Sequence, residues 1–387
     1  MKEFTYRHPT EVRFGRGRVK EVGQVARALG KRCLLVSCPA TGPIEAQVSL
    51  VRSQLEKAGC SVFHFGGVVP NPTTDSVSAG SRLARETDAE VVIGLGGGSS
   101  IDTAKAIAVE AAHEGGAWDY LYYKKAPSEK TLPIVAVTTT SGTGSHMTQV
   151  AVLTHTEERT KSAIFHARVF PMVSIVDPDL MVSVPPHVTA STGFDVLAHA
   201  FESSLHTGGS CFADMLAVEA MRIVKVYLPR AVSRGDDIEA REEMAWADTL
   251  AGLCIAHAGV TLPHGIGMTI GGFFPHVMHG ESLAVTYPEF TRFTWRSAMP
   301  KFAVMGRILD QSLENQSEEV AAELSCAALD AFLKEIGMWT SLETLGIGQE
   351  EVGLIADKSQ MLPDYKNNPR VATRDEIYEM LRASYRR

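Results

Sequence analysis

The chain has 387 residues, of which 45% are hydrophobic and 21% are charged, so its composition is that of a globular protein and a disordered chain is excluded. The net charge of −8 argues against nucleic-acid or anionic-membrane partners, because phosphate groups bind cationic surfaces. No apolar run approaches the roughly 20 residues that span a bilayer, and the N-terminus lacks the apolar core of a signal peptide. Six scattered cysteines without a C-x-x-C pair are typical of a cytoplasmic protein with reduced thiols.

Up to about Asp179, short β-branched runs alternate with amphipathic segments. The expected strands are Cys33–Ser37, Val62–Phe65, Val91–Leu95, Ile134–Val137 and Val173–Val176, and the expected helices are Ile44–Ala58, Asp75–Glu86 and Ile101–Ala112. Strands that are apolar along most of their length are typical of a buried parallel sheet. The alternation of strands and helices predicts such a sheet, whose ligands bind at the carboxyl ends of the strands.

Beyond Asp179 the pattern becomes helical. The expected helices are Gly193–Ser204, Phe212–Tyr227, Asp237–Ala258, Ser317–Ile336, Gly348–Lys358 and Thr373–Ser384. The turn Val184–Pro186 marks the expected boundary. We therefore expect an α/β domain over residues 1–182 and an all-helical domain over residues 183–387, with the active site in the cleft between them.

A glycine-rich turn follows the strand that begins at Val91. Glycines 96–98 and the serines after them lead from the strand into the next helix, an arrangement in which backbone N–H groups and the helix dipole can bind a phosphate. The turn is neither a G-x-G-x-x-G fingerprint nor a Walker A loop, and a tight structural turn is the alternative. A second polar cluster, Thr138–Ser145, follows the next strand, and the two clusters together suggest a dinucleotide.

A possible metal site begins with Asp195 and His199, whose i and i+4 spacing places a carboxylate and an imidazole on one helix face. His264 and His279 each lie next to a glycine, in largely apolar surroundings. One aspartate and three histidines form a mixed oxygen and nitrogen donor set that fits Fe²⁺ or Zn²⁺ better than Ca²⁺ or Mg²⁺. From spacing alone, satisfied core histidines explain the pattern equally well.

Taken together, these motifs resemble the iron-containing (group III) alcohol dehydrogenases, which belong to the dehydroquinate synthase-like superfamily. The similarity runs nearly from end to end and is carried by Phe14–Gly17, Pro70–Thr73, Gly96–Asp102, Thr139–Ser145, Asp177–Pro178, Gly193–Glu202, Ala251–Gly252, Pro263–Gly265, His279–Gly280 and Asn368–Arg370. The resemblance implies a Rossmann-like dinucleotide-binding N-terminal domain and an all-α metal-binding C-terminal domain. It also implies an NAD(P)-dependent enzyme that transfers a hydride between a small alcohol and the dinucleotide.

The resemblance implies one metal ligand at each of four positions: Asp195, His199, His264 and His279. These four are therefore also the expected catalytic residues, with Fe²⁺ as the expected ion and Zn²⁺ as a possible substitute. His276 competes with His279 for the last place. We prefer His279 because it precedes a glycine, and we interpret His276 as a residue of the pocket wall.

The resemblance also implies the residues that bind NAD or NADP. Gly97, Gly98 and Ser99 would contact the pyrophosphate, with Asp102 near the start of the same helix; Thr139, Thr140 and Thr143 would lie beside the nicotinamide half, and Asn71 near the adenosine. Lys161 matches a lysine that reaches the ribose in relatives, and a solvated surface lysine is the alternative.

Four positions depart from the family pattern: Cys38, Thr138, His146 and Met268. Cys38 stands where NAD-preferring relatives carry an aspartate, which would bind the ribose 2′-OH and repel a 2′-phosphate, so NADP is allowed. Met268 replaces a histidine four residues after the third ligand, so a proton relay through that position is not expected.

We therefore expect a cytoplasmic, metal-dependent alcohol dehydrogenase or aldehyde reductase that forms homodimers or larger homo-oligomers. A dehydroquinate synthase-like lyase is an alternative, but its phosphorylated substrate needs basic residues that the sequence around positions 250–290 lacks. A polyol or hydroxy-acid dehydrogenase of the same superfamily and a non-catalytic nucleotide-binding protein are further alternatives. The sequence does not identify the substrate, although apolar residues near the expected pocket favour a small alcohol or aldehyde.

Overall fold

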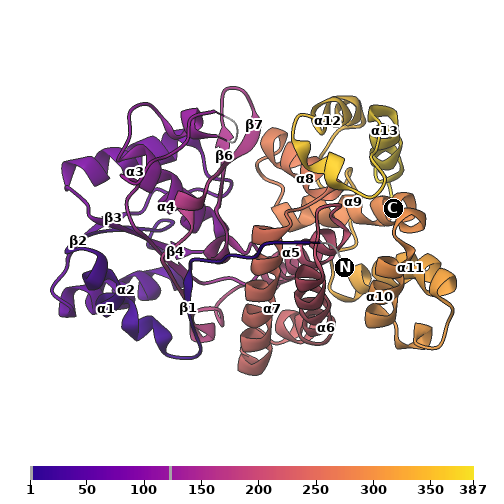
Figure 1. Ribbon diagram of the computed structural model, residues 1–387, viewed down its shortest axis with the longest axis horizontal. Helices are drawn as coiled ribbons and strands as arrows, with labels where there is room; N and C mark the ends of the chain where they lie inside the picture. Colours follow the sequence, from indigo (N-terminus) through magenta and orange to yellow (C-terminus); the bar gives the residue numbers. More distant parts are fainter. Residues whose placement is uncertain (1–2, 122–123) are drawn as a thin grey trace. The chain divides into compact units, whose positions relative to one another are not determined.

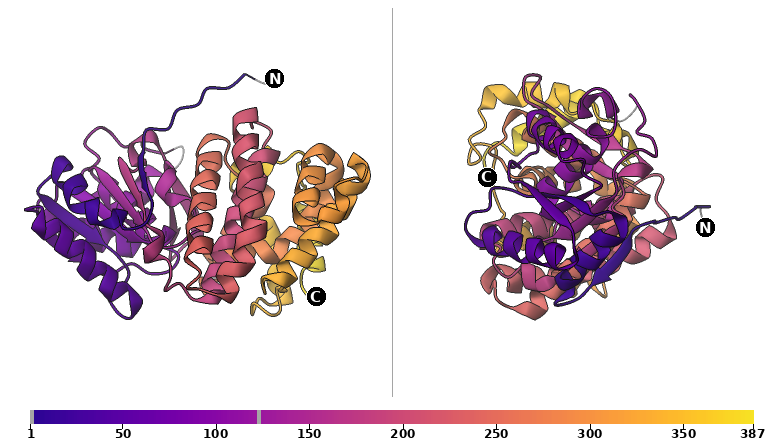
Figure 2. Two further views of the ribbon diagram at one scale, coloured as in Figure 1. Left: turned by 90° about the horizontal axis from the view of Figure 1, so that it is seen from below. Right: turned by 90° about the vertical axis from the view of Figure 1, so that its left-hand side faces the viewer.

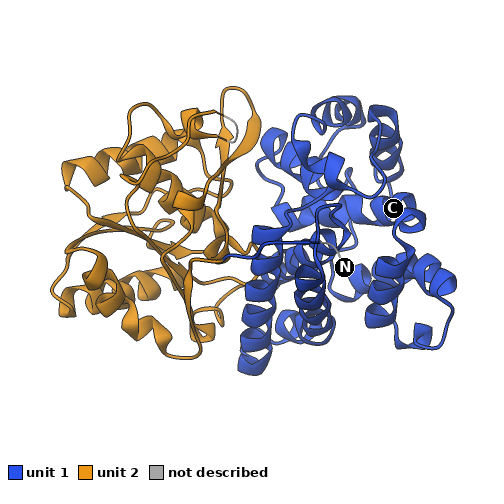
Figure 3. Cartoon of the chain, in the orientation of Figure 1, with its two compact units in different colours: residues 1–7, 185–387 blue, residues 8–184 orange. Residues whose placement is uncertain are grey.

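The computed structural model describes residues 3–121 and 124–387, which form two compact units (Figure 3). Unit 2 is His8–Val184, and unit 1 combines the N-terminal arm up to Arg7 with Pro185–Arg387. The break after Val184 lies close to the predicted boundary. The arm up to Arg7 belongs to the helical unit, whereas the sequence analysis assigned it to the α/β domain.

Within its described residues, unit 2 contains a six-stranded parallel sheet in the order β1-β8-β5-β4-β2-β3. Figure 1 labels β1, β2, β3 and β4 of this sheet. The strands are β1 (Glu11–Phe14), β2 (Arg32–Val36), β3 (Ser61–Phe65), β4 (Val91–Gly96), β5 (Ile134–Thr138) and β8 (Val173–Val176), and the helices are α1 (Val22–Leu29), α2 (Pro43–Lys57), α3 (Thr74–Glu86) and α4 (Gly98–Glu110). Five of these strands were predicted, and the short edge strand β1 was not.

Both faces of the sheet are buried. Alternate residues of each strand point to opposite sides, so each strand contributes to two separate cores. Leu34 and Val36 of β2 belong to the core under α3 and α4, whereas Cys33 and Leu35 belong to the core under α1 and α2. Figure 1 shows α1 and α2 on one side of the strands and α3 and α4 on the other, and Figure 2 gives two further views of these layers. The arrangement explains why the strands are apolar along their whole length.

A second, two-stranded sheet in unit 2 was not predicted. β6 (Val150–His155) and β7 (Thr160–Phe165) form an antiparallel hairpin, in which Thr154 pairs with Lys161. β6 begins with four apolar residues, of which Ala151 and Leu153 are buried while Val150 and Val152 are half-buried, and Ile164 of β7 is also buried. β6 packs on α4, which is the helix that follows the glycine-rich turn.

Unit 1 is helical in all the elements that the structure describes. Its helices are α5 (Pro186–Leu205), α6 (Cys211–Ser233), α7 (Ile238–His257), α8 (Leu262–Phe273), α9 (His279–Thr294), α10 (Met299–Leu309), α11 (Glu318–Glu335), α12 (Val352–Lys358) and α13 (Arg374–Ala383). Ser210 and Asp237 begin α6 and α7 by accepting backbone N–H groups of the first turn. α5 packs against α6, α7 and α9, so most of its side chains are buried.

Three helices of unit 1 were missed by the sequence analysis: α8, α9 and α10. α8 contains four glycines and α9 contains Pro288, residues that have low helix propensity. Burial of both helices in the core outweighs that propensity. Among the described residues, no single helix is long and apolar enough to cross a membrane; α7 and α8 pass that test only as a pair, and the pair is bent by 101°.

Candidate active site

Helix α5 presents three polar side chains on one buried face. Asp195, His199 and Glu202 are spaced i, i+4 and i+7, and all are at most 5% exposed. The rest of the helix surface near them is apolar and packed, with Phe194, Leu197 and Phe201 fully buried. A carboxylate and an imidazole in such surroundings need polar partners from other elements.

Two further histidines reach this face from the beginnings of α8 and α9. His264 is the third residue of α8, next to Pro263, which is suited to the first turn of a helix. His279 is the first residue of α9, and Glu281 fixes that start by accepting the backbone N–H of Met278 at 2.9 Å. The start of each helix therefore sets the position of its histidine.

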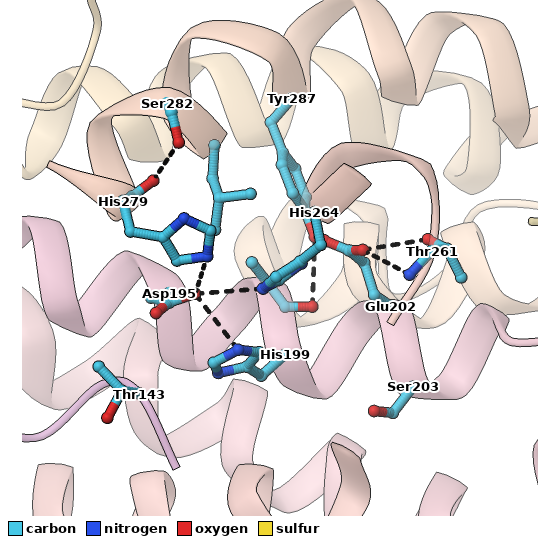
Figure 4. A network of polar contacts seen from close by, with 12 residues as sticks. Thr143, Asp195, His199, Glu202, Ser203, Thr261, His264, His279, Ser282 and Tyr287 are labelled. Carbon is cyan, nitrogen blue, oxygen red and sulfur yellow. Dashed lines mark hydrogen bonds and ion pairs between the residues drawn. The ribbon is translucent and has the colours of Figure 1, made fainter. Parts of the chain in front are cut away.

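The three imidazoles surround one oxygen of Asp195 (Figure 4). The distance to Asp195 Oδ1 is 3.5 Å from His199 Nε2, 3.5 Å from His264 Nε2 and 4.0 Å from His279 Nε2. The ligand atoms of Asp195, His199 and His264 all lie within 4.8 Å of one another, whereas the His279 side chain is 24% exposed and lies at the edge of the cluster. His276 lies elsewhere, with its Nε2 3.0 Å from the carbonyl of Leu345.

The donor set fits a divalent ion. Asp195 Oδ1 and His264 Nε2 are buried, and neither has a hydrogen-bond partner in the described part of the chain. Two ligands that bind one tetrahedral ion at ~2.1 Å lie roughly 3.4 Å apart, which is close to their observed separation of 3.5 Å. A carboxylate with several imidazoles is typical of Fe²⁺ and Zn²⁺ sites.

Glu202 holds the far side of the His264 ring. Its Oε1 lies 2.7 Å from His264 Nδ1 and 3.1 Å from the hydroxyl of Tyr287, and its Oε2 accepts the N–H and the hydroxyl of Thr261 at 2.8 and 3.2 Å (Figure 4). Burial lowers the pKa of His264, but the charge of Glu202 and the contact with Asp195 raise it more, to about 10. The two carboxylates thus favour a positive charge between them.

The glycine-rich turn of unit 2 lies against the second polar cluster. Gly97 caps α4, and a Cβ built on it would lie 2.8 Å from Thr140 Oγ1. A Cβ on Gly98 would lie 2.8 Å from Thr143 Cγ2, and Thr139 N–H donates to the carbonyl of Gly96 at 3.0 Å. The turn after β4 and the loop after β5 are therefore neighbours, as expected from the pairing of the two strands.

Asn71 and Lys161, expected near the dinucleotide, contact each other. Lys161 Nζ donates to Asn71 Oδ1 at 2.9 Å, and Lys161 is only 8% exposed. The alternative of a solvated surface lysine is therefore wrong. The contact joins the hairpin strand β7 to the turn before α3, where Asn71 has a φ of +54°.

Asp102 lies one turn inside α4 and anchors the hairpin. Its Oδ2 accepts the backbone N–H of Val152 at 3.1 Å, and its Oδ1 lies 4.0 Å from Lys105 Nζ. Burial raises the pKa of Asp102, an effect that Lys105 partly offsets. Ser99 lies in the first turn of the same helix, and its carbonyl accepts the hydroxyl of Thr103.

Comparison with known proteins identifies the family. A model of the iron-containing alcohol dehydrogenases matches residues 9–178, and a model of the C-terminal part of the same family matches residues 189–385. The chain belongs to the iron-containing alcohol dehydrogenase family. The resemblance noted from the sequence motifs is thereby confirmed.

Relatives match this alcohol dehydrogenase along nearly their whole length. The NAD-dependent methanol dehydrogenase of Bacillus methanolicus is 34% identical over 368 residues, which are 95% of this chain and 96% of that protein. The 1,3-propanediol dehydrogenase of Citrobacter freundii is 33% identical over 99% of both chains. The structure of NADH-dependent butanol dehydrogenase A from Thermotoga maritima has a TM-score of 0.90 at 28% identity, over 100% of this chain and 99% of that one.

The four residues that depart from the family pattern are all buried or half-buried in the structure. Thr138, the last residue of β5, donates its hydroxyl to the carbonyl of Thr140 at 3.0 Å and so stabilises the following turn. His146 is 1% exposed, and burial lowers its pKa to about 3, so the imidazole is neutral. Cys38 is half-buried after β2, next to Ser37, and Met268 is half-buried on α8.

Two acidic residues near the candidate metal cluster of Asp195, His199, His264 and His279 were missed by sequence reasoning. Glu202 stands seven residues after Asp195, a helical spacing that could have identified it. Asp364, in a short 3-10 helix (Pro363–Asn367) that packs on α8, carries no such signal. Burial raises its pKa to about 6, while the charges of His264 and Glu202 act on it in opposite directions.

Proposed function

We propose that this family member oxidises a small alcohol, or reduces the corresponding aldehyde, at a divalent ion held by Asp195, His199, His264 and His279. The observation that carries the proposal is the pair of buried, unpartnered atoms, Asp195 Oδ1 and His264 Nε2, at the centre of the cluster. Burying such atoms without a partner costs free energy that an ion would recover. The names of relatives, which include methanol and 1,3-propanediol dehydrogenases, support the alcohol as substrate class.

The protein side of the proposed mechanism is positioning. The ion, when bound, supplies Lewis-acid polarisation of the substrate oxygen, and the nicotinamide supplies the hydride acceptor or donor. Asp195 is the one anion among the four ligands, so these side chains compensate half of a divalent charge. Glu202 orients His264, and the packed apolar residues around α5 exclude water from the buried side of the cluster.

We further propose that unit 2 binds the dinucleotide through the residues predicted from the sequence. Gly97, Gly98 and Ser99 would place backbone N–H groups of α4 on the pyrophosphate. Thr139, Thr140 and Thr143 lie in the neighbouring loop, and Asn71 and Lys161 form one hydrogen-bonded pair. Asp102 would act indirectly, by fixing the hairpin that carries Lys161.

The proposed dinucleotide is NAD or NADP, with NADP permitted by Cys38. A carboxylate at this position would repel a 2′-phosphate, and the thiol removes that repulsion. The adjacent Ser37 hydroxyl lies 2.8 Å from His64 Nε2, and both are polar groups at the carboxyl ends of β2 and β3. Cys38→Asp is expected to shift selectivity toward NAD, measured as the ratio of kcat/KM values for the two dinucleotides.

The proposed ion is Fe²⁺, with Zn²⁺ as a functional substitute, because the donor set suits both. We also propose a homodimer or larger homo-oligomer in the cytoplasm. The six cysteines, all within the described residues, are free, as a reducing compartment requires. Neither nucleic acid nor a membrane is a proposed partner, in keeping with the net charge of −8.

A substrate panel tests this function. Purified protein reconstituted with Fe²⁺ is assayed with short alcohols and aldehydes, each with NAD(H) and NADP(H), by absorbance of the reduced nicotinamide. We expect net formation of the reduced dinucleotide from at least one alcohol and its consumption by the matching aldehyde. A lyase that recycles its hydride internally would give no net change. Absence of turnover with every pair, with Fe²⁺ and with Zn²⁺, would reject the proposed activity.

A further inference from the structure

Glu202 is the most enclosed carboxylate near the metal cluster, and it is not one of the proposed ligands. It is 0% exposed, and all the hydrogen bonds that the structure gives to its carboxylate oxygens come from donors of α8 and α9 or from the residue before α8. Thr261 supplies two of these hydrogen bonds to Oε2, and Tyr287 and His264 approach Oε1. A carboxylate accepts hydrogen bonds and donates none, so Glu202 requires a proton on each of these neighbours.

This requirement fixes the tautomer of His264. Its Nδ1, 2.7 Å from Glu202 Oε1, must carry the ring proton, so the lone pair of the neutral ring lies on Nε2. Nε2 is the nitrogen that faces Asp195 Oδ1 at 3.5 Å. Glu202 therefore determines both which nitrogen is available to an ion and the direction in which it points.

We infer that Glu202 is a positioning residue that holds His264 with its Nε2 lone pair aimed at the ion, and that Thr261 and Tyr287 hold Glu202 in turn. The inference rests on the proposed metal site and deepens it. It assigns a role to a side chain that does not touch the ion, and it makes the metal affinity of the cluster depend on Thr261 and Tyr287, which lie behind the ligands.

An amide at position 202 would conflict with its neighbours in either orientation. With its NH₂ toward Thr261, two donors would face each other at the 2.8 Å contact with the Thr261 N–H. With its NH₂ toward His264, the amide would donate to Nδ1 and favour the proton on Nε2, where it blocks ion binding. Glu202→Gln is therefore a near-isosteric change that should weaken metal binding through the ring it orients.

The test is a titration of the metal-free protein with Co²⁺, which has visible absorption bands that report its ligands. Relative to the unmodified protein, Glu202→Gln is expected to weaken Co²⁺ binding by about 10- to 100-fold and to change the shape of the bands. Tyr287→Phe removes only one hydrogen bond to Glu202, so it should weaken binding by a smaller factor. Both effects are measured on binding and on the spectrum, independently of turnover.

Ser203→Ala is the matched control on the same helix. Ser203 is equally buried but donates its hydroxyl to the carbonyl of Gly259 at 2.9 Å, away from His264 (Figure 4). This variant should bind Co²⁺ with unchanged affinity and bands. Weakening by Ser203→Ala equal to that by Glu202→Gln would overturn the inference, because general loosening of α5 would then explain both.

The outcomes separate this inference from the proposed function. Failure of the unmodified protein to bind Co²⁺ would reject the metal site itself. Tight Co²⁺ binding by Glu202→Gln with unchanged bands would reject only the positioning role. If circular dichroism shows that Glu202→Gln does not fold, Tyr287→Phe and Thr261→Val decide: weakened binding with altered bands supports the role, and unchanged binding in both rejects it.

Discussion

The buried ammonium of Lys105 in unit 2 and the facing atoms of Asp195 and His264 in unit 1 differ in how completely hydrogen bonds satisfy them. In unit 2, Lys105 is 0% exposed, and its Nζ lies 2.8 Å from the carbonyl of Thr148, 3.2 Å from the Thr148 hydroxyl and 2.6 Å from the carbonyl of Val150. In unit 1, Asp195 Oδ1 and His264 Nε2 face each other at 3.5 Å without a hydrogen bond.

The difference separates a buried charge with a structural role from the proposed metal ligands. An ammonium group has three protons, and the three acceptors around Lys105 use all of them. Asp195 Oδ1 and His264 Nε2 remain available, although the other nitrogen of the His264 ring lies 2.7 Å from Glu202 Oε1. Burial and charge alone therefore do not identify a binding site, whereas unused donor or acceptor capacity at a convergence of side chains does.

The largest expected effect is loss of the ion on removal of a central ligand. His264→Ala should abolish bound metal and lower turnover by at least about 10³-fold, because the remaining donors cannot close the site. Metal analysis and kcat are measured on the same sample. Circular dichroism should remain native, and a variant that keeps full activity without metal would contradict the role of the cluster.

The next largest effect is a loss of folding stability in Lys105→Met, with no expected change in metal binding. Lys105→Met removes the donor of three hydrogen bonds and should destabilise unit 2 by about 2–4 kcal/mol, because the acceptors of Thr148 and Val150 remain buried. Denaturant unfolding measures this loss. Co²⁺ affinity should be unchanged, and a parallel loss of metal would show that the Lys105 contacts and the metal cluster are not independent.

The difference in stability between the unmodified protein and Lys105→Met depends on pH with a known sign. Burial lowers the pKa of Lys105 from 10.5 to about 8, partly opposed by Asp102. The folded chain therefore loses this proton more easily than the unfolded chain, and the stability of the unmodified protein relative to Lys105→Met should rise between pH 8 and 10.5. The difference should be flat below pH 8. A fall across that interval would contradict a pKa of Lys105 that is lower in the folded chain than in the unfolded chain.

A smaller effect is expected at the glycine-rich turn. A Cβ at Gly98 would lie 2.8 Å from Thr143 Cγ2 and 2.9 Å from Thr143 Cβ, so Gly98→Ala must displace the neighbouring loop. We expect KM for the dinucleotide to rise about tenfold or more, which corresponds to ~1.4 kcal/mol of binding free energy. Metal content should not change. An unaltered KM would remove the turn from the proposed dinucleotide site.

The smallest effect is expected at the rival histidine. His276 contacts the carbonyl of Leu345 and lies outside the cluster, so His276→Ala should change metal affinity by less than about twofold. His279→Ala, tested in parallel, should weaken metal binding strongly. Reversal of the two results would assign the fourth ligand to His276.

The sequence predicted the fold class and the family, and both are confirmed. The apolar strands and the Asp195 and His199 spacing are local patterns, which is why they were accessible. The four glycines of α8 hid a helix that only tertiary burial stabilises. The hairpin β6–β7 was missed because its strands do not alternate polar and apolar residues and no strong turn signal lies between them.

The metal ligands remain a prediction from the resemblance, and the contacts behind them depend on packing. Glu202 stands on the predicted helix, but its bonds to Thr261 and Tyr287 join residues 59 and 85 positions apart, so no local pattern predicts them. Asp364 lies still further along the chain. Asn71 and Lys161 were assigned separately, and the missed hairpin is the reason that their contact was not foreseen.

The most direct measurement is anomalous X-ray diffraction from crystals of the protein loaded with Fe²⁺ or Zn²⁺, recorded at the absorption edge of the metal. We predict one strong peak within roughly 2.3 Å of the ligand atoms of Asp195, His199 and His264, with His279 completing the set. A peak at another position, or no peak in a crystal of active protein, would contradict the account.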